Sequence, residues 1–312
     1  MVESRFMSQT WLWILFAAAV TAMLAVDLGA FGRRAHRPGI RESAAWSAAW
    51  IALALSFGGA IWALQGPERA MLYLTGYVLE KSLSVDNLFV FLIIFRFFAI
   101  GGEHQSRVLH WGILGAIVMR FVFIYAGVSL IQRSHWVLTV FGAILLWTGA
   151  KMLLSGTRQH EPAQHPALRL LRKLVPVTET LHGSSFFARV DGALCATPLF
   201  AALVVIEASD LVFAADSIPA ALAVTPDLFL VYTSNIFAVM GLRALYFLLE
   251  SSLSEFRHLK TGISVALLYV GGKLLLSPWL EIPAGWSLAV IAAVLGLSIA
   301  ASQIPVKNSG EH

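Results

Sequence analysis

The sequence is poor in cysteine and in charged residues. A single cysteine, Cys195, occurs in 312 residues, which excludes an internal disulfide and any cluster of thiolate metal ligands. Only 13% of the residues are charged, whereas a soluble domain has roughly 25%. Hydrophobic residues make up 58% of the chain, and its mean hydropathy is +0.76. Because a soluble core could not enclose so much apolar sequence, the composition predicts an all-α polytopic membrane protein in a lipid bilayer.

Several sequence motifs are also absent, and their absence narrows the range of possible functions. The chain has no Walker A phosphate loop, so it carries no ATP motor of its own. Its apolar stretches contain neither a nucleophile with its base nor a His-Glu-x-x-His zinc motif, and we do not expect an enzyme or a resident cofactor. The pI is near 9.4, but the basic residues fall in short loops between apolar stretches, where they indicate topology. We therefore expect no nucleic-acid partner.

Apolar stretches long enough to cross a bilayer recur along the chain. At about 20 residues per crossing, they predict nine transmembrane helices. The first stretch is followed by its basic cluster, which favours a retained helix over a cleaved signal peptide. Basic residues concentrate in alternate loops, which places the N-terminus outside and the C-terminus in the cytoplasm of an inner-membrane protein. The expected helices span residues 10–30, 43–64, 70–98, 107–131, 135–154, 194–217, 228–250, 261–278 and 284–303.

Two parts of the chain resemble each other in three successive helices. LLWTGAKMLLSG at 145–156 matches LLYVGGKLLLSP at 267–278, while Arg120 pairs with Arg243 and Asp86 with Asp210. Three helices per copy invert the second copy relative to the first, an architecture of secondary transporters. The predicted units are two peripheral helices (1–69), repeat 1 (70–154), a cytoplasmic polar loop (155–193), the inverted repeat 2 (194–278), and a C-terminal helix and tail (279–312).

The most informative residues are acids within two of the apolar stretches. A charge at the membrane centre costs about 3 kcal/mol or more, so an ion site is the first hypothesis. Ligands that are all oxygen favour Mg²⁺, Ca²⁺ or Mn²⁺ over Zn²⁺ or Cu⁺. The predicted metal ligands are Glu80, Asp86, Asn87, Glu207, Asp210 and Asp216, with Asn235 of the next helix as a further candidate.

Helical spacing adds detail to this prediction. Glu207 and Asp210 are three residues apart and share a helix face. Asp216 is nine residues from Glu207, which places it on the opposite side of an unbroken helix. Pro219 disfavours helical conformation at the preceding residue, so we expect a break near 216–217 that turns Asp216 toward the other acids.

The two acidic segments resemble a known family. EKSLSVDNLFVF and IEASDLVFAADSIPAALAVT resemble the motifs of the TerC family, which includes the Alx proteins, and the resemblance covers about residues 40–303. It implies a transporter of the LysE-type superfamily, in a family named for tellurium resistance and linked to manganese export. The resemblance, not the ligand list, selects Mn²⁺, and it implies that the five acids and Asn87 line the metal path. Five carboxylates make a poor site for an oxyanion, which disfavours direct tellurite transport.

The resulting hypothesis is an inner-membrane secondary transporter that exports Mn²⁺, or a related divalent cation, by proton antiport. The alternative is a membrane scaffold or partner protein for metalation, secretion or tellurium-stress resistance without transport. Structural pairing of the acids with Lys81, Arg120 and Arg243, or a proton relay without metal, would also account for their burial. A homo-oligomer and a secretion-machinery partner stay open as binding partners.

Overall fold

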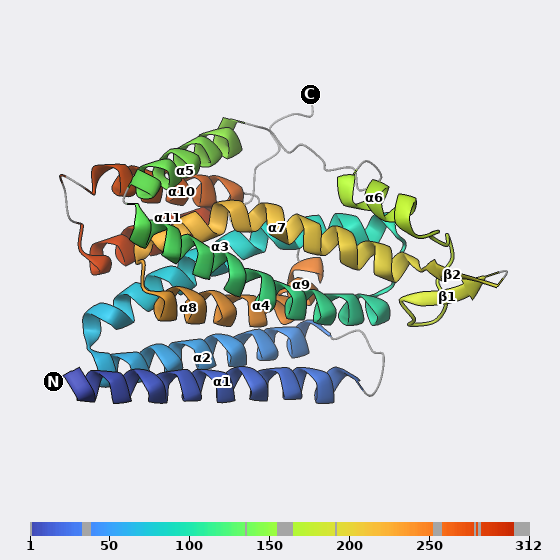
Figure 1. The fold of residues 1–312 in the computed structure, drawn as a ribbon, viewed down its shortest axis with the longest axis horizontal. Helices are drawn as coiled ribbons and strands as arrows, with labels where there is room; N and C mark the ends of the chain where they lie inside the picture. The colour runs from blue at the N-terminus through green and yellow to red at the C-terminus, as the bar shows by residue number, and fades with distance from the viewer. Residues whose placement is uncertain are drawn as a thin grey trace, which may run out of the picture.

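The computed structural model describes residues 2–32, 39–134, 136–154, 165–190, 192–251, 258–277, 279 and 282–302. Long helices lie side by side, and a short helix and a β-hairpin extend from one end of the bundle (Figure 1). The elements are α1 (Val2–Gly32), α2 (Ile40–Gln65), α3 (Pro67–Phe97), α4 (Gly102–Arg133), α5 (Trp136–Leu154), α6 (Pro166–Leu174), β1 (Phe187–Val190), β2 (Ala193–Ala196), α7 (Pro198–Val224), α8 (Leu228–Met240), α9 (Leu242–Ser251), α10 (Leu259–Leu276) and α11 (Ala284–Ser302).

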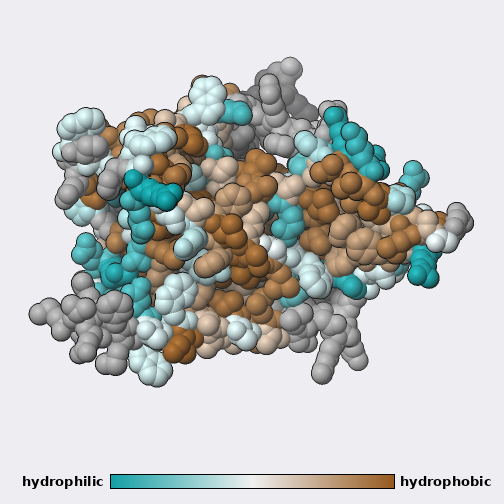
Figure 2. All heavy atoms as spheres, viewed as in Figure 1, coloured by the Kyte–Doolittle hydropathy of each residue, from teal (hydrophilic) through white to brown (hydrophobic). Residues whose placement is uncertain are grey.

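The bundle has the composition of a membrane protein. Among the described residues, seven helical segments are long and apolar enough to cross a bilayer. The charged residues of α3 interrupt its apolar stretch, and the apolar part of α10 is shorter than a full crossing, so neither is among the seven. Apolar side chains cover much of the face in Figure 2. The all-α polytopic fold is confirmed, while the expectation of nine crossings stays a prediction.

The helix break expected near Asp216 is wrong. Helix α7 continues through Pro219, although the proline removes one backbone donor. Pro219 and the residues on both sides of it are buried, so packing against neighbouring helices compensates for the lost hydrogen bond. The interruption occurs in the next transmembrane segment, where Gly241 separates α8 from α9.

Lys81 lies at this interruption. Its ammonium donates a hydrogen bond to the Ala238 carbonyl oxygen, in the last turn of α8, at 3.1 Å. A positive charge at a helix C-terminus is favourable because the carbonyl groups there have no helical partners. No ion pair among the described residues includes Lys81, so it does not balance the buried acids by direct pairing.

Two glycine contacts join α5 to α10. A Cβ added at Gly142 would lie 3.2 Å from the Gly271 carbonyl oxygen, and one added at Gly149 would lie 3.0 Å from the Ser264 carbonyl oxygen. In the repeat, which has an offset of 122 residues, Gly142 corresponds to Ser264 and Gly149 corresponds to Gly271. Exchanging the two copies therefore maps each of these contacts onto the other. In addition, α3 packs on α8 and α4 packs on α7. An inverted repeat requires such reciprocal contacts, and the repeat itself stays a prediction.

We expect Gly271→Ala to destabilise the protein by about 1–3 kcal/mol, because overpacking a close contact costs that much. The new methyl group would meet the Gly142 carbonyl oxygen and the Leu145 side chain at 3.0 Å. Gly272→Ala is the matched control, since a Cβ at Gly272 meets nothing within 4 Å. Thermal unfolding in detergent measures the difference, and equal midpoints for the two variants would refute the close contact.

Candidate functional site

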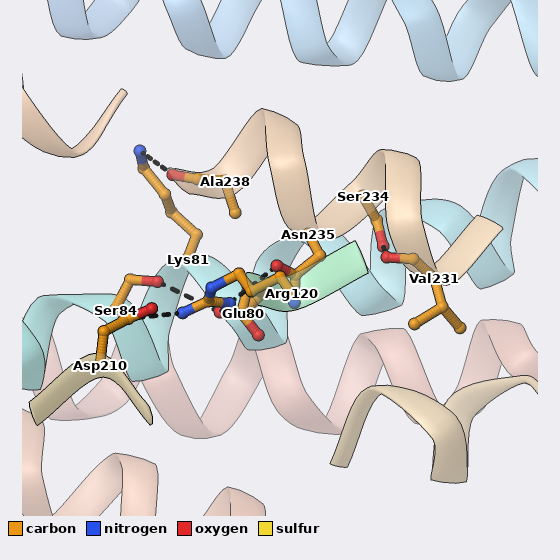
Figure 3. Close-up of polar contacts among 9 residues, drawn as sticks. All are labelled: Glu80, Lys81, Ser84, Arg120, Asp210, Val231, Ser234, Asn235 and Ala238. Atoms are coloured by element: carbon orange, nitrogen blue, oxygen red, sulfur yellow. Dashed lines mark hydrogen bonds and ion pairs between the residues drawn. The ribbon is translucent and has the colours of Figure 1, made fainter. Parts of the chain in front are cut away.

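A buried arginine lies at the centre of the candidate site. Arg120, on α4, is 0% exposed, and its guanidinium pairs with the Glu80 carboxylate of α3. It also donates to Asp210 Oδ1 of α7 at 3.1 Å and to Asn235 Oδ1 of α8 at 2.7 Å. Figure 3 shows these side chains converging from four helices. A buried guanidinium is stable only when paired in this way, so the acids and the amide hold Arg120 in place.

The cluster around Arg120 retains unused acceptor oxygens. Two carboxylates face one guanidinium, which leaves one negative charge in excess. Among the described residues, Glu80 Oε2 and Asp210 Oδ2 are buried and have no hydrogen-bond partner. An unpaired buried acceptor is costly, so these two atoms are candidates to bind a cation or an ordered water.

Asp210 also lines a first cavity, together with Glu207 and Arg243. The cavity lies among α3, α4, α7 and the α8–α9 junction, and its other walls are largely apolar. Glu207 and Asp210 therefore share a face, which confirms the prediction from their spacing. The Glu207 carboxylate rests directly on the backbone of α4, because a Cβ built at Gly115 would overlap its oxygens. Glycine at this position makes room for a carboxylate between two packed helices.

A second cavity contains Asn87 and Asp216. It lies among α3, α5, α7 and α10, and Thr148 and Ser217 also line it. The Thr148 hydroxyl donates to Asp216 Oδ1 at 2.8 Å. Asp216 and Glu207 line different cavities, as their nine-residue spacing on a continuous helix requires. At 1.5 Å per residue, Asp210 and Asp216 are about 9 Å apart along α7.

The structure thus divides the predicted ligands between two places. Glu80 and Asp210 meet at Arg120, Glu207 shares the first cavity, and Asn87 and Asp216 share the second. The side chain of Asp86 lies outside the described residues. Across the ranges that the structure describes, no group of three or more histidine, cysteine, aspartate or glutamate side chains is arranged to hold a metal ion. The assignment of these six residues to a metal path stays a prediction.

Sequence reasoning missed Thr148, Ser217 and Gly115. Hydroxyl residues and glycines are common in apolar helices, where they also allow close helix packing. Their presence in the sequence therefore does not indicate a functional site. Thr148 reaches Asp216 across 68 residues of sequence, and Gly115 contacts a carboxylate on another helix. Only the arrangement of the helices reveals these roles.

The chain is similar to proteins from several bacteria. It is 46% identical over 298 residues to the uncharacterized membrane protein STKORF319 of Myxococcus xanthus, covering 96% of this chain and 93% of that protein. It is 45% identical over 294 residues to an Escherichia coli protein named "Putative membrane-bound redox modulator Alx", covering 91% of each chain. An uncharacterized membrane protein of Rickettsia felis is 39% identical over 300 residues, covering 96% of this chain and 99% of that protein.

No solved structure matches the chain. The model of the family described as "Integral membrane protein TerC family" matches residues 65–309, which include both acidic helices, Arg120 and the α8–α9 interruption. The chain therefore belongs to the TerC family of integral membrane proteins.

Proposed function

We propose that this protein is a secondary transporter that exports Mn²⁺ across the bacterial inner membrane. The observation that carries the proposal is the pair of unpartnered buried oxygens, Glu80 Oε2 and Asp210 Oδ2, beside a cavity that also contains Glu207. Carboxylate oxygens are the ligands that hard divalent cations prefer. The ligand types fit Mg²⁺ and Ca²⁺ as well, and the TerC resemblance is the reason to choose Mn²⁺.

Charge balance supports a cationic cargo. Five carboxylates lie within the apolar stretches of α3 and α7, and Lys81, Arg120 and Arg243 carry three positive charges within the same bundle. The negative charges outnumber the positive ones, which favours a cation over an anion as cargo. In the structure Arg120 neutralises part of this negative charge. An entering cation would bind the free oxygens of the same acids.

Export of a dication requires a second ion. Outward movement against an inside-negative potential costs about 4.6 kcal/mol per 100 mV, twice the cost for one charge. With no ATP motor, the protein must couple export to a cation that enters the cell. The proton is the coupling ion expected from the acids alone.

Cellular manganese during a manganese challenge tests the proposal. We expect cells that carry Asp86→Ala or Asp210→Ala to retain manganese, because each variant removes a carboxylate from the proposed path. Glu103→Ala, at the exposed start of α4, is the control and should clear manganese like the unchanged protein. If both path variants, expressed at the same level, also clear manganese normally, the site assignment is wrong.

A scaffold function is the second candidate, and α6 is the observation that favours it. Leu168 and Leu171 are buried where α6 packs on α7, whereas Leu170 is 58% and Leu174 is 72% exposed. Exposed leucines on a basic amphipathic helix can contact a partner or a membrane surface. Purified protein in proteoliposomes distinguishes the two functions: a transporter moves ⁵⁴Mn²⁺ by itself, and a scaffold moves none.

The name of the Alx relatives suggests redox modulation. This chain has one cysteine, so it cannot form an internal dithiol pair. We propose that any redox effect of this chain follows from the metal that it exports.

A further inference from the structure

The cavity around Asp216 differs in chemistry from the cavity around Glu207. Two carboxylates line the Glu207 cavity, whereas Asp216 is the one carboxylate among the described residues of the other. Three neutral oxygen-bearing side chains accompany it: Asn87, Thr148 and Ser217. We propose that these four residues form a second cation site, which binds Na⁺. Its role as the coupling-ion site rests on the proposed export function, but Na⁺ binding does not.

Ser217 is the residue that points to a ligand. It is 4% exposed, and within the described residues its hydroxyl has no hydrogen-bond partner. A serine hydroxyl inside an apolar helix usually bonds to the carbonyl one turn earlier. Ser209 of the same helix does so, donating to the Val205 carbonyl oxygen at 2.7 Å. The Ser217 hydroxyl lines the cavity without such a bond, so it is available to a bound ion.

The other two neutral residues are also arranged to offer oxygen atoms. The Thr148 hydroxyl donates a hydrogen bond to Asp216 Oδ1, so the lone pairs of its oxygen can still bind a cation. Asn87 is 4% exposed and lines the same cavity with an amide that can present its oxygen. All four side chains line one cavity, so a carboxylate, an amide oxygen and two hydroxyl oxygens are available there, a ligand set suited to a hard cation.

Charge selects a singly charged ion. The remaining wall residues are uncharged: Leu83, Met152, Phe213, Ile263 and Leu267. Among the described residues, no ion pair within 4.0 Å joins Lys151 of α5 to Asp216. One carboxylate in an apolar cavity neutralises one positive charge, and a dication there would leave a buried excess charge.

The neutral ligands favour Na⁺ over a proton. A proton would bind Asp216 alone and would leave Asn87 and Ser217 without a function in the cavity. A metal ion, in contrast, needs several oxygen atoms to replace its hydration shell. The three neutral residues therefore match the needs of Na⁺.

Binding of ²²Na⁺ to the full-length protein in nanodiscs tests the site. We expect Ser217→Ala to weaken Na⁺ binding roughly tenfold, the change in affinity for losing one oxygen contact to a charge. Asp216→Asn should abolish binding. Ser209→Ala is the matched control, because that hydroxyl already bonds to its own helix, and its affinity should stay within about twofold of the unchanged protein.

Several results would overturn the inference. Absence of ²²Na⁺ binding by the unchanged protein would do so, as would equal affinities for Ser217→Ala and Ser209→Ala. If Ser217→Ala fails to fold, Thr148→Val tests the same cavity and should weaken binding by a similar factor. Binding of Na⁺ without ⁵⁴Mn²⁺ flux would refute the proposed function and leave the site intact. Flux driven by a pH gradient in Na⁺-free buffer would assign coupling to the proton.

Discussion

Arg120→Gln is expected to destabilise the protein by about 3–5 kcal/mol, the cost of leaving a buried ion-pair partner uncompensated. The substitution leaves the Glu80 and Asp210 carboxylates facing each other in a site that is closed to solvent. Unfolding in a denaturing detergent measures the loss. Arg69→Gln is the control, because the Arg69–Asp227 pair is about a third exposed and such a pair contributes roughly 1 kcal/mol or less.

Neutral partners should restore much of this stability. Adding Glu80→Gln and Asp210→Asn to Arg120→Gln removes both uncompensated charges and keeps the side-chain shapes similar. Comparison of this triple variant with Arg120→Gln alone then separates charge imbalance from lost packing. If the triple variant is no more stable than Arg120→Gln alone, packing and not charge compensation is the main contribution of the arginine.

The largest effect on transport is expected for Glu207→Gln. Loss of even an outer-sphere partner of a metal costs about 10–100-fold in affinity or activity, and a carboxylate that contacts the cargo should cost at least as much. Stability should change little, because Glu207 lines the first cavity but does not pair with Arg120. Initial rates of ⁵⁴Mn²⁺ flux in proteoliposomes measure the loss, and a rate close to that of the unchanged protein would exclude Glu207 from the path.

A glycine variant tests whether the position of the same carboxylate matters, because it moves the carboxylate without removing its charge. Gly115→Ala should displace the Glu207 carboxylate, because the added methyl group would occupy its place. Gly112→Ala is the matched control one turn earlier on α4, where the nearest atom would be at an ordinary contact distance of 3.5 Å. We expect Gly115→Ala to reduce flux strongly and Gly112→Ala to leave it nearly unchanged. Equal rates for the two variants would show that the position of Glu207 is not critical.

Hydropathy is sufficient to predict the membrane fold. Each long apolar stretch must form a helix in lipid because its backbone groups have no water to bond to, so residues such as those of α2 and α11 are readily placed. The acids are equally visible, because a charge within an apolar stretch is costly and therefore rare. The shared face of Glu207 and Asp210 also follows directly from helix geometry.

Contacts between helices are harder to predict from the sequence than the helices themselves. Pro219 suggested a broken helix, yet buried neighbours hold α7 together and Gly241 interrupts a different segment. The two cavities could not be separated by spacing alone, because Thr148 and Gly115 lie on other helices than the acids they contact. Local periodicity describes one helix at a time, whereas these features depend on how several helices pack.

The exchange of the two glycine contacts between α5 and α10 has a consequence for the origin of the chain. Because each contact becomes the other after a shift of 122 residues, a half-length chain with both small residues would be complementary to a second copy of itself. Two such copies would associate as a symmetric dimer only if they entered the bilayer in opposite orientations. If the gene of such a dual-topology homodimer were duplicated and the copies fused, the fused chain would have the pattern of contacts seen between these helices.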